Sequence, residues 1–364
     1  MDFKTDCRFF KGERPCAPYK ICEACSGYQP MGQRILIIKL GAIGDVLRTT
    51  PLLTGLKKKW PDSFITWLTY PESLEVLCHN NLIDRLLGYD LGSILRLEVE
   101  DFDLVLSLDK MVEATALAAK IKAGKKKGFY LGDKGQLLPL DKDSEYAYRL
   151  GLDDKLKFKE NTKTYPEIVF EMAGLPYQGE EYILNLTPQE DDYTRALRKR
   201  YRFKQRKVVG LNTGCGKVFA TKKWTRDGFV KLGKLLSKLK VATLILGGPE
   251  EEKRNRTLAR RLKGQVISTG CHNTLRQFMS IIDLCDVVVT GDTIALHLAI
   301  ALKKKVVALF GSTAGSEIDL YGRGEKLSVE VPCSPCYLGD CENDNICMTS
   351  IKPEMVLEAI KRLL

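Results

Sequence analysis

Three turns in the second half of the chain combine small residues with groups that can bind a nucleotide. The first, 212–216 (NTGCG), can bring backbone N–H groups up to a phosphate, and a basic segment, 221–225 (TKKWT), follows it. The second, 247–251 (GGPEE), ends in carboxylates that can accept hydrogen bonds from ribose hydroxyl groups. The third, 290–297 (TGDTIALH), opens a helix whose N-terminus favours an anion. Each turn follows an apolar, strand-like run, so together they predict a nucleotide diphosphate site at the carboxyl edge of a parallel sheet.

Another candidate ligand-binding turn follows the first apolar run of the chain, 34–40 (RILIIKL). Gly41 and Gly44 let the backbone come close to a ligand, and Asp45 stands where the N-cap of a helix is expected. The spacing Gly-x-x-Gly-Asp is neither the dinucleotide fingerprint nor the Walker loop. From these residues alone, Asp45 is expected to cap its helix.

Eight of the twelve cysteines form two clusters, with spacings C-x8-C-x5-C-x2-C near the N-terminus and C-x2-C-x4-C-x5-C near the C-terminus. Four thiolates can close a structural zinc site or hold an iron–sulfur cluster. In a reducing compartment clustered cysteines indicate a metal before disulfides, although disulfides or free thiols stay open for the second cluster. The first cluster lies in a module without strand or helix periodicity, which needs a staple to fold. The candidate ligands are Cys7, Cys16, Cys22, Cys25, Cys333, Cys336, Cys341 and Cys347.

From residue 34 onward, strand-like runs alternate with helix-like segments, which predicts α/β architecture with parallel, doubly wound sheets. Strands are expected at 35–39, 64–69, 104–107, 127–130, 207–211, 242–247, 266–268, 287–290 and 306–310. Helices are expected at 45–59, 72–79, 111–122, 164–173, 189–200, 226–239, 250–262, 275–282, 295–302 and 352–364. Pro51 falls in the first turns of its helix, where a kink can form.

The chain of 364 residues is long enough for two domains. We expect a Cys-rich module at 1–30, a Rossmann-like domain at 31–186, and a second Rossmann-like domain at 187–364. The linker between the two larger domains is the Gly- and Glu-containing segment 176–188. The last domain carries the cysteine loop at 333–347 and a C-terminal helix.

The composition, 44% hydrophobic and 28% charged, is that of a soluble globular protein. Apolar runs such as 241–246 and 306–310 have the length of strands and are too short to cross a bilayer. The first residues contain no apolar h-region, so a cytoplasmic location is expected. The net charge of +11 favours an anionic partner, which can be nucleic acid, an anionic lipid surface or a phosphorylated substrate.

Several blocks, in this order, resemble the signature blocks of glycosyltransferase family 9, the heptosyltransferases that build the inner core of lipopolysaccharide. The blocks are GDVLRTTPLL, GLNTGCGKVFATKKW, LILGGPEEE, TGDTIALHLAIAL and VVALFGST, and CSPCYLGDCENDNICM resembles the cysteine-bearing tail of many members. The resemblance runs from about Arg34 to the C-terminus. It implies a GT-B fold, with two facing Rossmann-like domains that hold the acceptor mainly in the first and the donor mainly in the second.

The resemblance also implies a reaction: inverting, metal-independent transfer of heptose from ADP-L-glycero-D-manno-heptose to a lipopolysaccharide inner-core or related glycolipid acceptor. Asp45 matches the general base that takes the acceptor proton. Lys222 matches the lysine that neutralises the departing diphosphate, and Glu251 the carboxylate that binds the nucleotide ribose. The other candidates are Thr213, Gly214, Asp292, Thr293 and His297 for the donor, and Lys39, Gly41 and Gly44 near the phosphate or acceptor.

Two alternatives stay open. Ile294-Ala295 replaces the Gly-Pro pair of many members, which leaves room for another NDP-sugar or acceptor. A non-enzymatic nucleic-acid-binding protein is the more distant alternative, because aromatic residues (Phe9, Phe10, Tyr19 and Tyr28) interleave with the first cysteines. That alternative leaves the sugar-transferase motifs unexplained, so no nucleic acid partner is expected. The expected partners are a nucleotide-sugar, a glycolipid and the inner face of the cytoplasmic membrane, with no catalytic cofactor.

Overall fold

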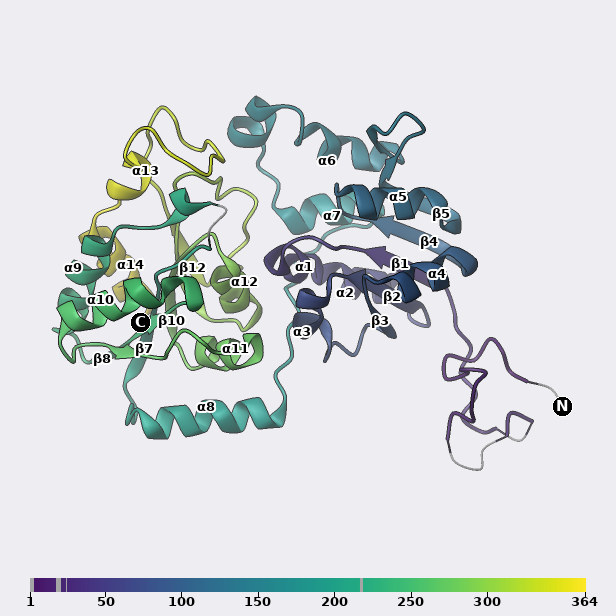
Figure 1. Cartoon of the computed structure of the whole chain (residues 1–364), viewed down its shortest axis with the longest axis horizontal. Coiled ribbons are helices and arrows are strands. Elements are labelled where there is room, and N and C mark those ends of the chain that lie inside the picture. The colour runs from purple at the N-terminus through teal and green to yellow at the C-terminus, as the bar shows by residue number, and fades with distance from the viewer. Residues whose placement is uncertain (1–2, 18–20, 24, 217–218) are drawn as a thin grey trace. The chain divides into compact units, whose positions relative to one another are not determined.

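The computed structural model of the protein describes residues 3–17, 21–23, 25–216 and 219–364. Tyr19, Lys217 and Val218, which belong to segments quoted above, lie outside the described residues. The chain forms two compact units, each built on its own sheet (Figure 1). The first unit extends to Asp154 and includes Pro166–Glu180, and the second consists of Lys155–Tyr165 and Glu181–Leu364.

The sheet of the first unit has the strand order β3-β2-β1-β4-β5-β6. All neighbouring pairs are parallel except β5 with β6, which is antiparallel. The strands are β1 (Arg34–Ile38), β2 (Phe64–Thr69), β3 (Arg85–Gly88), β4 (Asp101–Ser107), β5 (Lys122–Leu131) and β6 (Leu137–Pro139). The last four residues of β1 are fully buried, as expected for a central strand covered on both faces.

The helices of the first unit include two short ones where the sequence predicts a single helix at 45–59. The observed break follows Thr50, and Pro51 is the first residue of the second helix, because proline has no N–H to continue the preceding hydrogen-bond ladder. The helices are α1 (Ile43–Thr49), α2 (Pro51–Lys59), α3 (Leu74–Leu77), α4 (Leu91–Val99), α5 (Val112–Lys120), α6 (Glu145–Arg149) and α7 (Tyr165–Ala173). Two 3-10 turns, η1 (Pro71–Ser73) and η2 (Lys142–Ser144), precede α3 and α6.

The second unit has a six-stranded, wholly parallel sheet in the order β12-β11-β10-β7-β8-β9. Its strands are β7 (Lys207–Asn212), β8 (Val241–Leu246), β9 (Ile267–Ser268), β10 (Val287–Gly291), β11 (Lys305–Leu309) and β12 (Gly324–Leu327). Its helices are α8 (Pro188–Arg200), α9 (Arg226–Leu236), α10 (Glu252–Leu262), α11 (Leu275–Asp283), α12 (Ile294–Ala301), α13 (Ile346–Thr349) and α14 (Pro353–Leu363). Shorter helical turns are η3 (Leu156–Glu160), η4 (Ala220–Lys222) and η5 (Pro249–Glu251).

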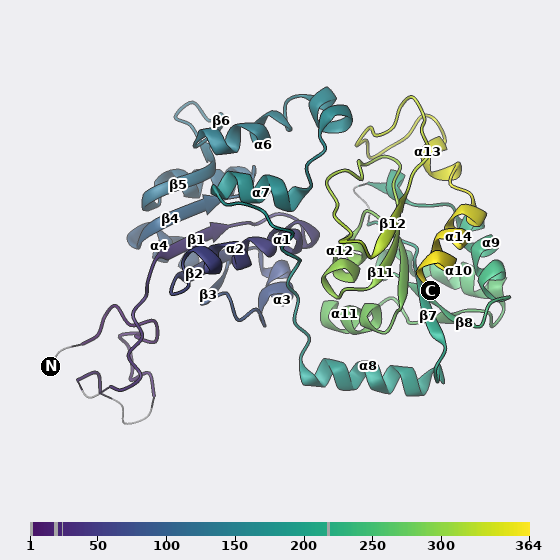
Figure 2. The ribbon, with the colours of Figure 1, turned by 180° about the vertical axis from the view of Figure 1, so that it is seen from behind.

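Helices cover both faces of the second sheet. Apolar side chains of α9, α10 and α14 pack with those of β7, β10 and β11 in one buried cluster, and α11 and α12 lie on the other side of the sheet (Figure 2). The N-cap threonines of α9 and α11 accept hydrogen bonds from the backbone N–H groups of Gly228 and Gln277, which fixes where these helices begin. No helix in the described ranges is both long and apolar enough to span a bilayer.

Several strands and α-helices lie outside the sequence prediction: β3, α4, β6, α6, β12 and α13. All four residues of β3 are only partly buried, so its sequence lacks the continuous apolar run that marks a central strand. The strand β5 begins at Lys122, five residues before the predicted start, because its charged first half is exposed and shows no apolar pattern.

Candidate functional site

Each sheet has one point where the strand order reverses, between β1 and β4 in the first unit and between β7 and β10 in the second. In open α/β sheets, ligands bind outside the carboxyl ends of the strands at such a point. The segments that follow β1 and β4 carry Asp45 and Asp109, and those that follow β7 and β10 carry Gly214 and Asp292.

In the first unit, Asp45 lies in the first turn of α1. The N-cap of this helix is Ala42, so the prediction that Asp45 is the N-cap was wrong. The Asp45 carboxylate instead pairs with the Arg48 side chain, with Oδ1 and Nε 3.0 Å apart, and its side chain is 38% exposed. The helix N-terminus therefore carries a partly accessible carboxylate that an arginine orients.

The turn that precedes α1 is fixed by Asp109, which the sequence analysis did not select. Its Oδ2 accepts hydrogen bonds from the backbone N–H groups of Leu40 and Gly41, at 3.0 and 2.6 Å, and from Lys39 Nζ at 3.2 Å. Lys39 and Asp109 are 5% and 7% exposed. The helix α1 begins without a side-chain cap, and the Ala42 carbonyl accepts the backbone N–H groups of Asp45 and Val46 at 2.7 and 3.0 Å. Asp45 therefore lies inside the first turn, three residues past the N-cap.

The turn leaves little room for a side chain at Gly41. A Cβ on Gly41 would lie 3.1 Å from both Asp109 Oδ2 and Lys39 Nζ. Gly44, the other glycine of the motif, is buried inside α1. Lys39 thus supports the turn through its buried ion pair with Asp109. The signal for Asp109 in the sequence is its position, one residue beyond the apolar run that forms β4.

In the second unit, a cavity of about 420 Å³ lies at the carboxyl ends of β7, β8 and β10. That volume is within the usual range for small-molecule sites, about 300–1,000 Å³. Among its lining residues are the predicted Gly214, Glu251 and Thr293, together with Leu275 and Phe278 of α11. The cavity therefore combines a carboxylate and glycine backbone with an apolar wall.

Glu251 is the buried acid of this cavity. Its side chain belongs to a residue only 6% exposed, and Oε2 accepts a hydrogen bond from the backbone N–H of Gly248 at 3.1 Å. Its Oε1 is buried without a hydrogen-bond partner among the residues that the structure describes. A buried carboxylate oxygen left without a donor is costly, so this atom is suited to a donor supplied by a ligand. Gly214 lies against it, since a Cβ there would fall 2.1 Å from the Glu251 carboxyl carbon.

A second group of predicted residues gathers around Asp292. Lys222 Nζ donates to Asp292 Oδ2 at 2.9 Å, and His297 Nε2 lies 3.9 Å from Asp292 Oδ1. The lysine and aspartate side chains are 17% and 19% exposed, so the ammonium is close to the surface while paired. Tyr182 stacks on the His297 ring. The structure thus brings Lys222, Asp292 and His297 together. Lys222 belongs to the segment 221–225, whereas Asp292 and His297 belong to the segment 290–297.

Thr293 is the N-cap of α12, and its hydroxyl accepts a hydrogen bond from the backbone N–H of Ala295 at 3.2 Å. Asn212, which ends β7, donates to the hydroxyl groups of Thr290 and Thr293 at 3.0 and 3.2 Å. Asn212 therefore joins the first and third turns of the predicted nucleotide site. The sequence analysis placed it in a loop but gave it no role; its signal is a polar side chain at the end of an apolar strand.

The predicted residue Thr213 is only 2% exposed and is absent from the cavity lining. Its hydroxyl donates to Asn255 Oδ1, and Asn255 in turn donates to the Leu246 carbonyl at 3.1 Å. Both side chains thus link β7, β8 and α10 underneath the cavity. Cys215, in the same loop, does line the cavity, and burial raises the pKa of its thiol.

Each of the two cysteine clusters has one buried, one exposed and two partly buried cysteines. All twelve cysteines are free thiols. In the second cluster, burial raises the pKa of the Cys347 thiol, and the neighbouring thiols of Cys333, Cys336 and Cys341 raise it further. Within the described ranges, no three His, Cys, Asp or Glu side chains are arranged closely enough to hold a metal ion.

Comparison with known proteins agrees with this arrangement. A model for Glycosyltransferase family 9 (heptosyltransferase) matches residues 94–347. Lipooligosaccharide heptosyltransferase 2 of Campylobacter jejuni is 29% identical over 164 residues, which cover 43% of this chain and 52% of that protein. The chain therefore matches about half the length of this relative. A protein of the same name from Haemophilus influenzae is 24% identical over 370 residues, covering 91% of this chain and 99% of that protein.

Among solved structures, ADP-heptose lps heptosyltransferase II of E. coli aligns with a TM-score of 0.68 and 18% sequence identity, covering 91% of this chain and 98% of that one. This likeness, with a parallel α/β sheet in each unit, confirms the predicted GT-B fold class. The family model matches more than half of the chain. The chain therefore belongs to glycosyltransferase family 9 (heptosyltransferase).

Proposed function

We propose that the protein transfers a heptose from ADP-L-glycero-D-manno-heptose to a lipopolysaccharide inner-core or related glycolipid acceptor, with inversion and without a catalytic metal. The lipooligosaccharide heptosyltransferases that the chain resembles support the sugar and the acceptor class. The donor site rests on one observation above all, the buried carboxylate of Glu251 beside a cavity at the carboxyl ends of β7, β8 and β10. Its Oε1 would accept a hydrogen bond from a ribose hydroxyl group.

The proposed reaction is a single displacement at the anomeric carbon. The acceptor oxygen attacks from the face opposite the diphosphate, and a new carbon–oxygen bond forms as the bond from the anomeric carbon to the diphosphate oxygen breaks. Asp45 takes the proton from the attacking hydroxyl group. The bond electrons leave with ADP, and Lys222 stabilises the charge that develops on the diphosphate. The backbone N–H groups at the start of α12, next to Thr293, would bind the same phosphates.

The arrangement of Lys222 suits this role. The ammonium is held 2.9 Å from Asp292 before any ligand arrives, so the protein has already restricted the rotamers of a long side chain. Preorganised charge of this kind lowers the barrier because little rearrangement is needed at the moment of reaction. Asp292 is thus proposed to position Lys222, and His297 to support Asp292 from the interior of α12.

A different NDP-sugar is the second candidate for the donor. Ile294 lines the cavity beside Leu275 and Phe278, at a position where many members have glycine. A branched side chain takes space that a glycine would leave for the ligand, so the shape of this wall bears on donor choice. The acceptor stays a glycolipid in either case.

Donor turnover tests the proposal directly. Purified protein is given ADP-, GDP- and UDP-sugars with a glycolipid acceptor, and nucleotide release is measured for wild type, Asp45→Asn, Lys222→Met and the exposed control Lys253→Met. We expect release from ADP-heptose alone, with kcat reduced by about 10²–10⁴ in Asp45→Asn and about 10²–10³ in Lys222→Met. Full activity of Asp45→Asn would refute the assignment of the base. Turnover of a different NDP-sugar alone would establish the second candidate.

We also propose that the second cysteine cluster holds a structural metal beside the donor site. The proposal is supported by the spacing C-x2-C-x4-C-x5-C of Cys333, Cys336, Cys341 and Cys347, the first three of which raise the pKa of the Cys347 thiol. Four thiolates are a suitable ligand set for zinc or an iron–sulfur cluster. The metal would fix the loop and take no part in catalysis. Loss of one metal centre in Cys336→Ser, measured by elemental analysis, is the expected result.

The location proposed for the protein is the cytoplasm, with peripheral contact to the inner face of the cytoplasmic membrane. The net charge of +11 supports attraction to anionic lipid and to a phosphorylated glycolipid. Sedimentation with vesicles that contain anionic phospholipid should be salt-sensitive. Equal sedimentation with neutral and anionic vesicles would contradict this membrane contact.

A further inference from the structure

The N-terminal module, residues 3–30 apart from 18–20 and 24, is a loop closed at its base. Arg8 N donates to the Gln29 carbonyl at 2.9 Å and Met31 N to the Asp6 carbonyl at 2.7 Å, and Cys7 forms an isolated antiparallel bridge with Pro30. These contacts bring the two ends of the loop together. Arg8 also joins the loop to the first unit, through Asp84 Oδ1 at 3.1 Å and the Asp62 carbonyl at 3.1 Å.

Hydrophobic burial does not stabilise this loop. Among its described residues, Cys7 is the only buried hydrophobic side chain, at 7% exposure. The large apolar side chains Phe3, Phe9 and Ile21 are 58%, 48% and 58% exposed. A segment of this size without a core needs a covalent or metal cross-link to keep one conformation. No disulfide joins its cysteines.

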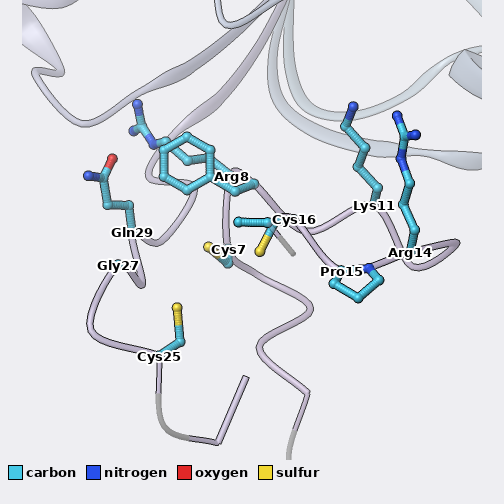
Figure 3. Close-up of a pocket in the computed structure, with 11 residues that line it drawn as sticks. Cys7, Arg8, Lys11, Arg14, Pro15, Cys16, Cys25, Gly27 and Gln29 are labelled. Atoms are coloured by element: carbon cyan, nitrogen blue, oxygen red, sulfur yellow. The ribbon is translucent and has the colours of Figure 1, made fainter. Parts of the chain in front are cut away.

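The thiols of the loop surround one hollow. Cys7, Cys16 and Cys25 line a cavity of about 840 Å³, and their sulfur atoms point toward a common space (Figure 3). Cys22 lies one turn before Cys25, and the Cys25 N–H donates to the Cys22 carbonyl at 3.2 Å. Cys22 also lines the adjoining cavity, together with Cys16. Three separate stretches of the loop thus contribute thiols to the same region.

The charges near this hollow are complementary to thiolates. Arg8, Lys11 and Arg14 line the same cavity. Four thiolates around one Zn²⁺ ion carry a net charge of −2, and nearby cations offset such a charge. Lys11 and Arg14 are exposed, and Arg14 makes an exposed ion pair with Glu13, at 3.8 Å.

We infer that Cys7, Cys16, Cys22 and Cys25 bind one structural metal centre through four thiolates, either a Zn²⁺ ion or an iron–sulfur cluster. The site is separate from the proposed catalytic groups and from the second cysteine cluster. In the described residues the thiols border the cavity without meeting at one point. Metal binding is therefore expected to bring the four thiols closer together. The metal would also supply the cross-link that the loop needs because it has no hydrophobic core.

The test measures metal content in the full chain. Zinc and iron per chain are determined by elemental analysis, and an iron–sulfur cluster is recognised by its visible absorbance. Cys25→Ser and Cys16→Ser are compared with wild type and with Cys78→Ser, which changes an exposed cysteine outside both clusters. We expect each variant of the loop to lose one metal centre that the Cys78→Ser protein keeps, while the second cluster is unchanged. Zinc loss identifies the ion, and loss of iron with the visible band identifies the cluster.

A second measurement separates metal binding from misfolding. Limited proteolysis of the wild-type protein, with and without a chelator, should show faster cleavage within residues 3–30 after metal removal, while cleavage of the remainder is unchanged. Cys25→Ser should be cleaved at this fast rate under both conditions. Metal content equal to wild type in both loop variants would overturn the inference. A mass lower by about 2 Da per disulfide in these cysteines, without metal, would overturn it as well.

Discussion

The hydroxyl of Thr221 donates a hydrogen bond to the main-chain carbonyl of Leu338, with an oxygen–oxygen distance of 2.7 Å. The same hydroxyl lies 3.0 Å from Ser312 Oγ, and Thr221 is 3% exposed. Leu338 belongs to the second cysteine cluster loop, and Thr221 directly precedes Lys222. The loop is therefore joined to the segment that carries the proposed diphosphate-binding lysine.

This contact predicts a selective loss of activity in Thr221→Val. Valine keeps the shape but removes the hydroxyl, so the Leu338 carbonyl loses its donor and Lys222 is positioned less well. We expect kcat to fall by about tenfold, which corresponds to one lost hydrogen bond of about 1.4 kcal/mol, with little change in KM for the acceptor. Steady-state nucleotide release measures both parameters.

Thr221→Ser serves as the matched control, since it keeps the hydroxyl and removes only a methyl group. Its kcat should stay close to that of wild type. If the valine and serine variants have equal kcat values, the hydrogen bond does not position Lys222, whatever the stability of the two proteins.

A stability prediction concerns the buried pair of Lys39 and Asp109. Asp109→Ala removes the acceptor of one ammonium and of the backbone N–H groups of Leu40 and Gly41. Breaking a buried ion pair from one side costs about 3–5 kcal/mol, because the other charge stays buried without compensation. The urea midpoint of Asp109→Ala should therefore fall well below that of Asp133→Ala, an exposed control.

Replacing both partners separates charge from packing. Lys39→Met combined with Asp109→Leu removes both charges of the pair, while the backbone N–H groups of Leu40 and Gly41 lose their carboxylate acceptor. The double variant is expected to be more stable than Asp109→Ala. A double variant that is less stable would show that the ion pair is not what makes Asp109 important.

Much of this fold follows from local sequence pattern, and much of the site does not. The buried strands β1, β2 and β7 lie within one residue of their predicted bounds, since runs rich in apolar and β-branched residues specify them. Asp109 acts on the turn at Leu40 and Gly41 from 69 and 68 residues away, so no local pattern reveals it. The N-cap expected at Asp45 was wrong because the helix begins earlier, with Ala42 as its N-cap, which lacks the side-chain oxygen that marks a cap in a sequence.

The cavity of the second unit gives a prediction about two glycines that both approach Glu251. In Gly214→Ala the new methyl carbon would fall 2.1 Å from the Glu251 carboxyl carbon, which forces the carboxylate to move. In Gly248→Ala the nearest atom, Glu251 Oε2, lies 3.7 Å away, an ordinary van der Waals distance. We expect Gly214→Ala to bind ADP about tenfold or more weakly, which is a loss of about 1.4 kcal/mol, and Gly248→Ala to bind it nearly as wild type does.

Isothermal titration calorimetry with ADP measures the two affinities. The pair shares one cavity and one chemical change, so differences in general stability have little influence on the comparison. Equal affinities in the two variants would mean that the position of the Glu251 carboxylate does not matter for nucleotide binding.

The free energy of unfolding should depend on pH through Glu190, which connects the start of α8 with α11. Burial by itself would raise the pKa of Glu190, but hydrogen bonds from Arg276 and from the Thr187 backbone outweigh it and hold the pKa below its usual value. A carboxyl group with a lowered pKa in the folded state contributes stability above its unfolded pKa, about 4.3, and loses that contribution as the pH falls through the folded value. The free energy of unfolding of the second unit should therefore decrease below about pH 4.

Glu190→Gln tests this directly. At pH 7 the variant should be less stable than wild type by about 1–3 kcal/mol, because a charged partner of Arg276 is lost. As the pH falls through the lowered folded pKa, wild-type Glu190 becomes protonated, so the difference in urea midpoint between the two proteins should shrink. The exposed substitution Glu354→Gln should give the same small difference throughout this pH range. A stability difference for Glu190→Gln that does not change between pH 7 and pH 3 would show that the carboxylate charge does not hold α8 against α11.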